Sequence, residues 1–256
     1  MEITEQLNKH KFISRIFTVL AQSFLLLIRK VIKLSVTKDG NVVIISLLKL
    51  GDSVFIIPAI KEIQKYYQKK IVLICFSESI PIFNLALTGI SFCPVEHKDF
   101  FFNERIAKPK ARKILKSSHP EIIYDFNGVM TSATLIFNSK AKTIVGMGRE
   151  QFKTIYDIFI PENRNYHLMD IYLETIAPIV PILDRDTIKK FSRSNEKNNR
   201  ILIHPFAGWN AKEWSLARYI QLGSLLSEKY NVSIVAPAHS IKTDIVKELT
   251  EKGISF

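Results

Sequence analysis

The chain has 256 residues, of which 47% are hydrophobic and 23% charged; this composition is typical of a globular protein and excludes a largely disordered chain. Its two cysteines, Cys75 and Cys93, provide neither a disulfide framework nor a paired Cys/His zinc site. The 36 Lys and Arg against 24 Asp and Glu give a formal charge of +12, which favours an anionic partner. Nucleic acid is not expected to be that partner, because no recognisable nucleic-acid-binding module is present.

The first 40 residues differ from the rest of the chain. Between Phe12 and Ile32, apolar residues recur at helical spacing among Lys and Arg. The uncharged run within this stretch covers 16–28, 13 residues, whereas a membrane-spanning helix needs roughly 20. No small-residue cleavage site follows, so a secretory signal is not expected either. Two interpretations stay open: a basic amphipathic helix on an anionic membrane surface, or a helix that packs its apolar face on the protein.

A first α/β domain is predicted over residues 41–184. The apolar run Val42–Leu48 is typical of a buried parallel strand, and an apolar helix (54–67) and a second strand (71–76) follow it. Gly51 and Asp52 lie at the strand-to-helix turn, and such turns border the ligand-binding edge of open α/β sheets. Asp52 is therefore a candidate functional carboxylate, with capping of the helix as the alternative.

Strands and helices continue to alternate along this domain. Strands are expected at 91–95, 121–126 and 143–146, and helices at 103–116 and 131–137, which predicts a doubly wound sheet. Neither a Gly-x-Gly-x-x-Gly fingerprint nor a Walker-type phosphate loop occurs, so the sequence does not favour a dehydrogenase or a kinase.

A second α/β domain is predicted over residues 201–256, after a polar linker at 185–200. Strands are expected at 201–204, 232–236 and around Ile254, and helices at 216–230 and 241–252. Most domains have about 100–150 residues, so we expect this one to be incomplete.

Five motifs occur in a fixed order along these two domains. They are Leu50-Gly51-Asp52 with Pro58-Ala59 in the next helix, Asp125-x-x-Gly128-x-x-x-Ser132-Ala133, Gly146-x-Gly148-Arg149, His167-Leu168-Met169-Asp170, and His204-Pro205-Phe206-Ala207-Gly208-Trp209-Asn210-Ala211-Lys212-Glu213-Trp214-Ser215. Together they resemble the motifs of glycosyltransferase family 9, the ADP-heptose:lipopolysaccharide heptosyltransferases.

The resemblance implies a GT-B-like fold of two Rossmann-like domains with parallel sheets, with the acceptor on the first and the donor on the second. It implies that Asp52 is the general base that removes the proton of the acceptor hydroxyl. Lys212 matches the lysine that contacts the donor phosphates. His204, Gly208 and Trp209 would lie at the donor site, although a structural role for His204 and core packing of Trp209 are the alternatives.

Basic residues are the candidates for acceptor binding. The family carries a basic residue six positions before the aspartate, where this chain has Ser46, and Lys49 stands three positions before it instead. Arg149 belongs to the third motif. Lys113 lies in a basic helix that could bind acceptor phosphates, or could simply be solvated.

The resemblance implies an inverting, metal-independent sugar transferase without a cofactor. Its partners would be a nucleotide-sugar donor, with ADP-heptose favoured, and an anionic lipid-linked saccharide acceptor. It would act in the cytoplasm, as a peripheral protein at the inner face of the bacterial inner membrane.

The family's last signature, Asp-Ser/Thr-Gly-x-x-His, does not occur in the 256 residues. Compared with the family, the chain is therefore expected to be truncated at its C-terminus. The alternative function is that of a non-catalytic homologue that binds a membrane surface or a glycolipid.

Overall fold

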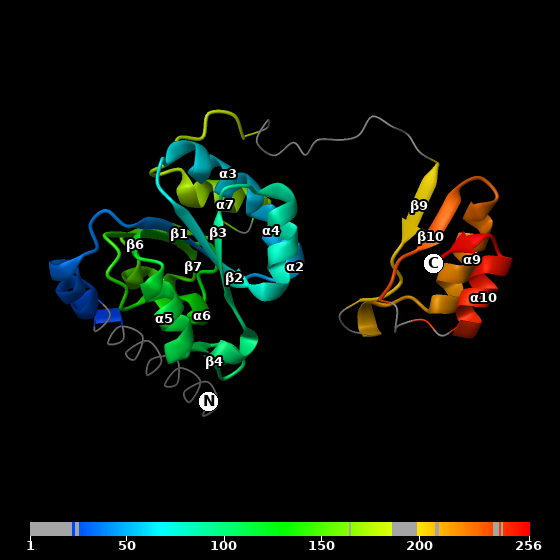
Figure 1. Cartoon of the computed structure of the whole chain (residues 1–256), viewed down its shortest axis with the longest axis horizontal. Helices are drawn as coiled ribbons and strands as arrows, with labels where there is room; N and C mark the ends of the chain where they lie inside the picture. The colour runs from blue at the N-terminus through cyan, green and yellow to red at the C-terminus, as the bar shows by residue number, and fades with distance from the viewer. Residues whose placement is uncertain are drawn as a thin grey trace, which may run out of the picture. The chain divides into compact units, whose positions relative to one another are not determined.

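The computed structural model describes residues 22–23, 26–163, 165–185, 199–207, 210–237, 241 and 243–256. The chain divides into two compact units, Met1–Lys190 and Phe191–Phe256. The division falls within the segment 185–200, of which residues 186–198 lie outside the described part. Each unit is an α/β structure with a parallel sheet, which confirms the predicted fold class (Figure 1).

The first unit is built on a six-stranded parallel sheet with the order β3-β2-β1-β6-β7-β8. Its strands are β1 (Asn41–Ser46), β2 (Ile71–Phe76), β3 (Ser91–Val95), β6 (Pro120–Asp125), β7 (Thr143–Gly148) and β8 (Ile158–Pro161). Nearly every residue of β1 and β2 is buried, because both faces of the sheet are covered, and this explains their continuous apolar sequences.

Helices cover the two faces of this sheet in separate layers (Figure 1). One layer consists of α2 (Leu50–Phe55), α3 (Ile57–Tyr66), α4 (Ile80–Ala86) and α7 (Leu168–Ile176). The other consists of α5 (Pro109–Ser117) and α6 (Met130–Ile136). Along β1 the residues alternate between the layers, with Ile44 packing in the first and Ile45 in the second.

Several elements differ from the prediction, and proline explains two of the differences. The expected helix 54–67 breaks at Ile56, because Pro58 has no N–H to donate and therefore sits in the first turn of α3. The expected helix 103–116 begins only at Pro109. The residues before it form an antiparallel hairpin of β4 (Phe100–Phe101) and β5 (Ile106–Ala107).

Other elements were absent from the prediction. These are α4, the edge strand β8, and the short 3₁₀ helices η1 (Lys33–Ser35), η2 (Ser77–Ser79), η3 (His97–Asp99) and η4 (Glu150–Ile155). The helices are shorter than the window in which helical periodicity can be recognised, and the four residues of β8 show no clear alternation.

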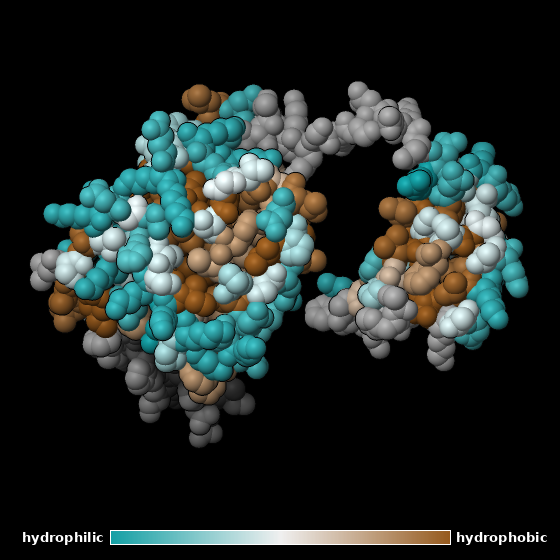
Figure 2. Space-filling view, in the orientation of Figure 1, coloured by the Kyte–Doolittle hydropathy of each residue, from teal (hydrophilic) through white to brown (hydrophobic). Residues whose placement is uncertain are grey.

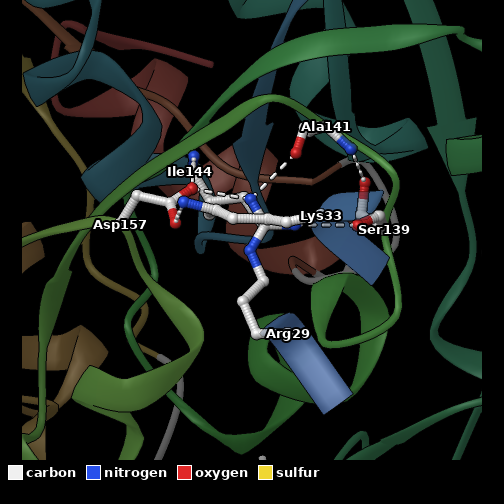
Figure 3. Close-up of polar contacts among 6 residues, drawn as sticks. All are labelled: Arg29, Lys33, Ser139, Ala141, Ile144 and Asp157. Atoms are coloured by element: carbon white, nitrogen blue, oxygen red, sulfur yellow. Dashed lines mark hydrogen bonds and ion pairs between the residues drawn. The ribbon is translucent and has the colours of Figure 1, made fainter. Parts of the chain in front are cut away.

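The described part of the N-terminal segment is tied to the first unit by a buried ion pair. Residues 26–32 are helical, and Arg29, only 5% exposed, pairs with Asp157 at 2.6 Å (Figure 3). Its guanidinium also donates to the carbonyl oxygens of Ser139 (2.9 Å) and Ala141 (2.8 Å). Lys33 approaches the other oxygen of Asp157 at 2.5 Å. For these residues, the basic side chains of Arg29 and Lys33 make the contact with the first unit, whereas the packing interpretation expected the apolar face to make it.

Apolar side chains of the same segment remain exposed, among them Leu27 and Val31. The rest of the predicted amphipathic helix, 12–21 and 24–25, lies outside the described residues. Within the described part of the chain, no helix has the length and apolar character needed to cross a bilayer.

The second unit contains a three-stranded parallel sheet with the order β11-β10-β9. Its elements are β9 (Arg200–Ile203), η5 (Asn210–Lys212), α9 (Leu216–Ser227), β10 (Asn231–Ile234), α10 (Thr243–Glu251) and β11 (Ile254–Ser255). All five predicted elements are present with shifted ends. Their apolar residues form one cluster, to which Ile203, Val232 and Ile254 contribute from the strands.

Candidate functional site

The first unit places its candidate residues at the carboxyl edge of the sheet, between β1 and β6. The strand order reverses at this point: the chain leaves β1 for β2 on one side and returns later to β6 on the other. Ligands of open α/β sheets bind at such switch points. The side-chain oxygen of Asn127 accepts from the N–H of Leu47 at 2.7 Å and so fixes the ends of both strands relative to each other.

Asp52 and Lys49 lie together at this edge, at the start of α2. Lys49 is the residue before the helix and is exposed, and Asp52, in the first turn, is half-buried. Gly51 between them is helical, and a Cβ atom built on it would meet no atom within 4 Å. This glycine is thus not required by the packing of the described chain. A carboxylate in this position can accept a hydrogen bond or a proton from the hydroxyl of a bound molecule.

A second carboxylate, that of Glu162, lies near Tyr172 and affects its pKa in the same direction as Asp52 does. Burial raises the pKa of the Tyr172 phenol on α7, and the negative charges of Asp52 and Glu162 raise it further. Tyr172 is itself held edge-to-face against Phe126, with ring centroids 5.5 Å apart. Glu162 cannot be recognised from the sequence, because it follows β8, a strand of four residues without clear alternation. Recognising that strand would have placed Glu162 at the same sheet edge as Asp52.

The second motif has a structural explanation centred on Asp125. This carboxylate is fully buried; it accepts hydrogen bonds from the N–H of Asn127 (2.9 Å) and the hydroxyl of Tyr156 (2.8 Å). Its pKa is raised, because burial disfavours the charged form more than the hydrogen bonds, including one from Ser132, favour it. Asp125 thus stabilises the carboxyl edge of the sheet from within the core, where no ligand can reach it.

The glycines of the second and third motifs interlock. Gly128 has a φ of +58°, and a Cβ there would lie 1.9 Å from the carbonyl oxygen of Met147. Gly148 has a φ of +121°, and a Cβ there would lie 2.5 Å from the oxygen of Gly128. Only glycine allows the two backbones to approach so closely. The contact brings Arg149, whose N–H donates to Gly128 at 3.3 Å, to the same edge as Asp52, with its side chain exposed.

The remaining candidate of this unit, Lys113, lies away from this edge, and Ser46 stands where the family has a basic residue. Lys113 is exposed in the middle of α5, in the helix layer opposite to that of α2, so the structure does not bring it together with Asp52. Ser46 is completely buried, and its hydroxyl has no hydrogen-bond partner among the described residues. A cation at that position would be buried, whereas Lys49 is open to a ligand.

In the second unit, the fifth motif follows β9. His204 is exposed, with its ring edge-on to Phe206 at 6.5 Å between centroids. Phe206, where the family has glycine, packs against the apolar cluster of this unit. The carboxylate of Glu213 accepts from the N–H of Ala207 at 2.9 Å and closes the loop. Lys212 is exposed at the end of η5.

Gly208 and Trp209 lie outside the described residues, so their predicted contact with the donor stays a prediction. Among the residues that the structure does describe, no group of three or more His, Cys, Asp or Glu side chains is arranged to hold a metal ion.

No family model and no curated protein sequence matches this chain. Solved structures with the same fold do exist. The E. coli heptosyltransferase WaaC with ADP matches with a TM-score of 0.61 and 16% identity, over 84% of this chain and 74% of that one. The glycosyl transferase family 9 structure from Veillonella parvula DSM 2008 matches with a TM-score of 0.59 and 13% identity, over 84% of this chain and 67% of that one.

A third structure, the E. coli ADP-heptose lps heptosyltransferase II, has a TM-score of 0.59 and 16% identity, over 83% of this chain and 70% of that one. The fold implied by the motif resemblance is therefore confirmed: the chain has the α/β architecture of the heptosyltransferases.

Proposed function

We propose that this chain is a glycosyltransferase that transfers a heptose or a related sugar from a nucleotide-sugar donor to a lipid-linked saccharide. The observation that carries the proposal is the fold shared with heptosyltransferases over 84% of the chain. One of these structures contains ADP, and another WaaC structure contains ADP-2-deoxy-2-fluoro heptose. ADP-heptose is accordingly the donor to test first, as a substrate and not as a cofactor.

In this proposal Asp52 is the general base. It accepts the proton of the acceptor hydroxyl while that oxygen attacks the anomeric carbon and the nucleoside diphosphate leaves from the opposite side. The anomeric centre is inverted and no metal ion takes part. The half-buried position of Asp52 in the first turn of α2, at the carboxyl edge of the sheet, supports this role, since a bound hydroxyl can reach the carboxylate there.

Cations attract the two anionic substrates in this scheme. Lys49 and Arg149, both exposed at the edge that holds Asp52, bind the acceptor. Lys212 binds the donor phosphates, and His204, with Gly208 and Trp209, contacts the nucleotide. Because the acceptor is lipid-linked, the protein works at the cytoplasmic face of the inner membrane.

The deciding experiment compares Asp52→Asn with Asp39→Asn in a sugar-transfer assay. Asp39 is exposed in a turn with a φ of +56°, which asparagine tolerates well, and it lies near the opposite, amino end of β1. With ADP-heptose and an acceptor glycolipid, Asp52→Asn should lower ADP release by roughly 100-fold or more, the usual effect of losing a general base. Asp39→Asn should leave the rate unchanged.

Equal rates for the two variants would remove Asp52 from the mechanism and leave it an acidic residue that stabilises the first turn of α2 through the helix dipole. If the unsubstituted chain binds the glycolipid but releases no nucleotide from any of several sugar donors, the alternative of a non-catalytic glycolipid-binding homologue is correct.

A further inference from the structure

The β4–β5 hairpin carries two adjacent phenylalanines that the described chain leaves uncovered. Phe101 is 48% exposed and Phe102 is 74% exposed. In Figure 2, hydrophobic side chains project at the end of this hairpin, and hydrophilic side chains surround its base. Two exposed neighbouring aromatic rings on a convex tip do not form a groove for a ligand, but they can insert into a soft apolar medium.

The base of the hairpin is firmly held, so the tip has a defined position. Phe100 is buried and packs edge-to-face against Phe76 at the end of β2, with ring centroids 6.1 Å apart. On the other strand, Ala107 is buried and its N–H donates to the hydroxyl of Thr134 at 2.9 Å. The residues on both sides of the tip are therefore anchored in the sheet and in α6.

The turn holds the two phenylalanines away from the core. Phe102, Asn103 and Glu104 have φ values of +52°, +52° and +66°, three successive left-handed residues without a glycine. This backbone is unfavourable, above all for a bulky residue such as Phe102. It is maintained by the N–H of Arg105, which donates to the carbonyl of Phe101 at 2.9 Å, and by the carboxylate of Glu104, which lies 2.6 Å from Nδ1 of His97.

Positive charge predominates in the hairpin and in the helix α5 that follows it. The segment 96–117 has seven Lys and Arg against three Asp and Glu, a formal net charge of +4. One of the three acids, Asp99, is buried and paired with Lys110 at 2.9 Å, and another is the Glu104 already described. The Nζ of Lys108 lies over the Phe101 ring, 4.6 Å from its centroid. The exposed cations are Lys98, Arg105, Lys110, Lys113 and Lys116.

We infer that the hairpin tip and the exposed side of α5 form a docking surface for an anionic phospholipid bilayer, in which Phe101 and Phe102 insert below the head groups. The surrounding Lys and Arg pair with the lipid phosphates, as basic side chains around an apolar insertion do. In this arrangement Lys113 has a role although it lies away from Asp52. The inference concerns the membrane partner of the proposed function, but it does not depend on sugar transfer.

The test is sedimentation of the full chain with vesicles of phosphatidylcholine, with and without phosphatidylglycerol. The double variant Phe101→Ser/Phe102→Ser should lose roughly 100-fold in affinity for the anionic vesicles, the loss expected for two partly inserted aromatic rings. The matched control is Leu85→Ser, because Leu85 on α4 is 89% exposed but lies in the other helix layer. This control should bind like the unsubstituted chain.

Separate variants test the contribution of the basic side chains and the insertion of Phe102 into the bilayer. Lys113→Ser and Lys116→Ser should each weaken binding by about fivefold at low salt, and the difference should shrink as salt is added. Phe102→Trp should show a blue shift of its fluorescence on addition of anionic vesicles, and Leu85→Trp should show none. Unchanged vesicle binding by the double serine variant, or no vesicle binding by the unsubstituted chain, would overturn the inference, and binding to a protein partner instead would do the same.

A soluble acceptor without its lipid separates this inference from the proposed function. The double serine variant should transfer sugar to that acceptor as fast as the unsubstituted chain does. If neither protein transfers sugar while the vesicle results are as expected, the proposed function is wrong and the docking surface stands.

Discussion

The two units of the chain both use parallel strands, but they bury their sheets in different ways. In the first unit, helices cover both faces of six strands, and two apolar clusters lie on either side of the sheet. In the second, the apolar cluster of the described residues lies on one face of three strands. The other face of that sheet carries exposed side chains, including Leu202, which is 64% exposed.

The hollow found in the second unit reflects this difference in how the sheets are covered. In the second unit, a hollow of about 420 Å³ lies on the exposed sheet face, lined by residues that include Arg200, Leu202 and Ser233. Neither His204 nor Lys212 lines it. The candidate residues of the first unit instead stand at a sheet edge whose strand ends are joined by the Asn127 side chain and by the close backbone contact of Gly128 and Gly148. Burial on both faces thus produces a rigid edge on which functional side chains can be positioned.

The largest expected effect is the loss of stability when the close backbone contact at the sheet edge of the first unit is disrupted. Gly128→Ala should destabilise the first unit by roughly 4 kcal/mol or more, because its Cβ would overlap the carbonyl of Met147 in an already left-handed backbone. Gly51→Ala, in open space, should be neutral or stabilising by about 0.5–1 kcal/mol. In the second unit, Gly223→Ala should cost less than Gly128→Ala, since the atom that its new Cβ would overlap is the terminal Cδ1 of the Ile254 side chain, at 2.7 Å, and not backbone.

Urea denaturation followed by far-UV circular dichroism measures all three variants. If Gly128→Ala unfolds at the same urea concentration as the unsubstituted chain, the two backbones do not approach as closely as the structure shows.

The second largest effect concerns the N-terminal anchor of the first unit. Asp157→Asn leaves the charge of Arg29 buried without its counter-ion, and breaking such a pair costs about 3 kcal/mol. The matched control is Glu150→Gln, which removes an exposed ion pair to Lys153 (3.1 Å) and should have no measurable effect. Thermal denaturation of the two variants at neutral pH checks this difference.

The pH dependence of this effect has a defined sign. Burial alone would raise the pKa of Asp157, but the hydrogen bonds from Arg29, Lys33 and the N–H of Ile144 lower it below the usual 3.8. The carboxylate therefore stabilises the fold fully above that ordinary value, and the stabilisation is lost as the pH falls through the lowered pKa. The difference between Asp157→Asn and the unsubstituted chain should shrink in acid. A constant difference down to the lowest pH at which the chain folds would contradict the ion pair.

The sequence allowed prediction of what local periodicity encodes. Apolar runs predicted β1 and β2, and the position of Asp52 after the first strand placed it at the carboxyl edge of the sheet. The order of the five motifs predicted the fold that the solved structures share. The strands and the position of Asp52 depend on neighbours within about ten residues, and each single motif is equally local.

The features that escaped prediction depend on distant contacts. Arg29 reads as one basic residue of an amphipathic helix, and only the fold brings Asp157, 128 residues away, to its side chain. Glu162 needed an edge strand whose four residues carry no clear alternation. The hairpin tip at Phe102 needed left-handed backbone in three residues, none of which is a glycine. Sequence alone offers no signal for a backbone that tertiary contacts impose.

The smallest expected effect tests the difference in burial directly, in two pairs of adjacent residues. In β1, Ile44 and Ile45 point to opposite faces and both are fully buried, so Ile44→Ala and Ile45→Ala should each cost about 2 kcal/mol or more. In β9, Ile203→Ala should have a similar cost, because this side chain is 8% exposed in the apolar cluster. Leu202→Ala, on the exposed face, should stay within about 0.5 kcal/mol.

Hydrogen exchange of the β9 and β10 amides measures the stability of the second unit separately from that of the first. A cost for Leu202→Ala equal to that of Ile203→Ala would mean that another surface covers the exposed sheet face. Repeating the measurement at several protein concentrations would then identify the cover. A cost that grows with concentration indicates a second copy of the chain, since association contributes to stability by mass action, whereas a constant cost indicates a segment of the same chain.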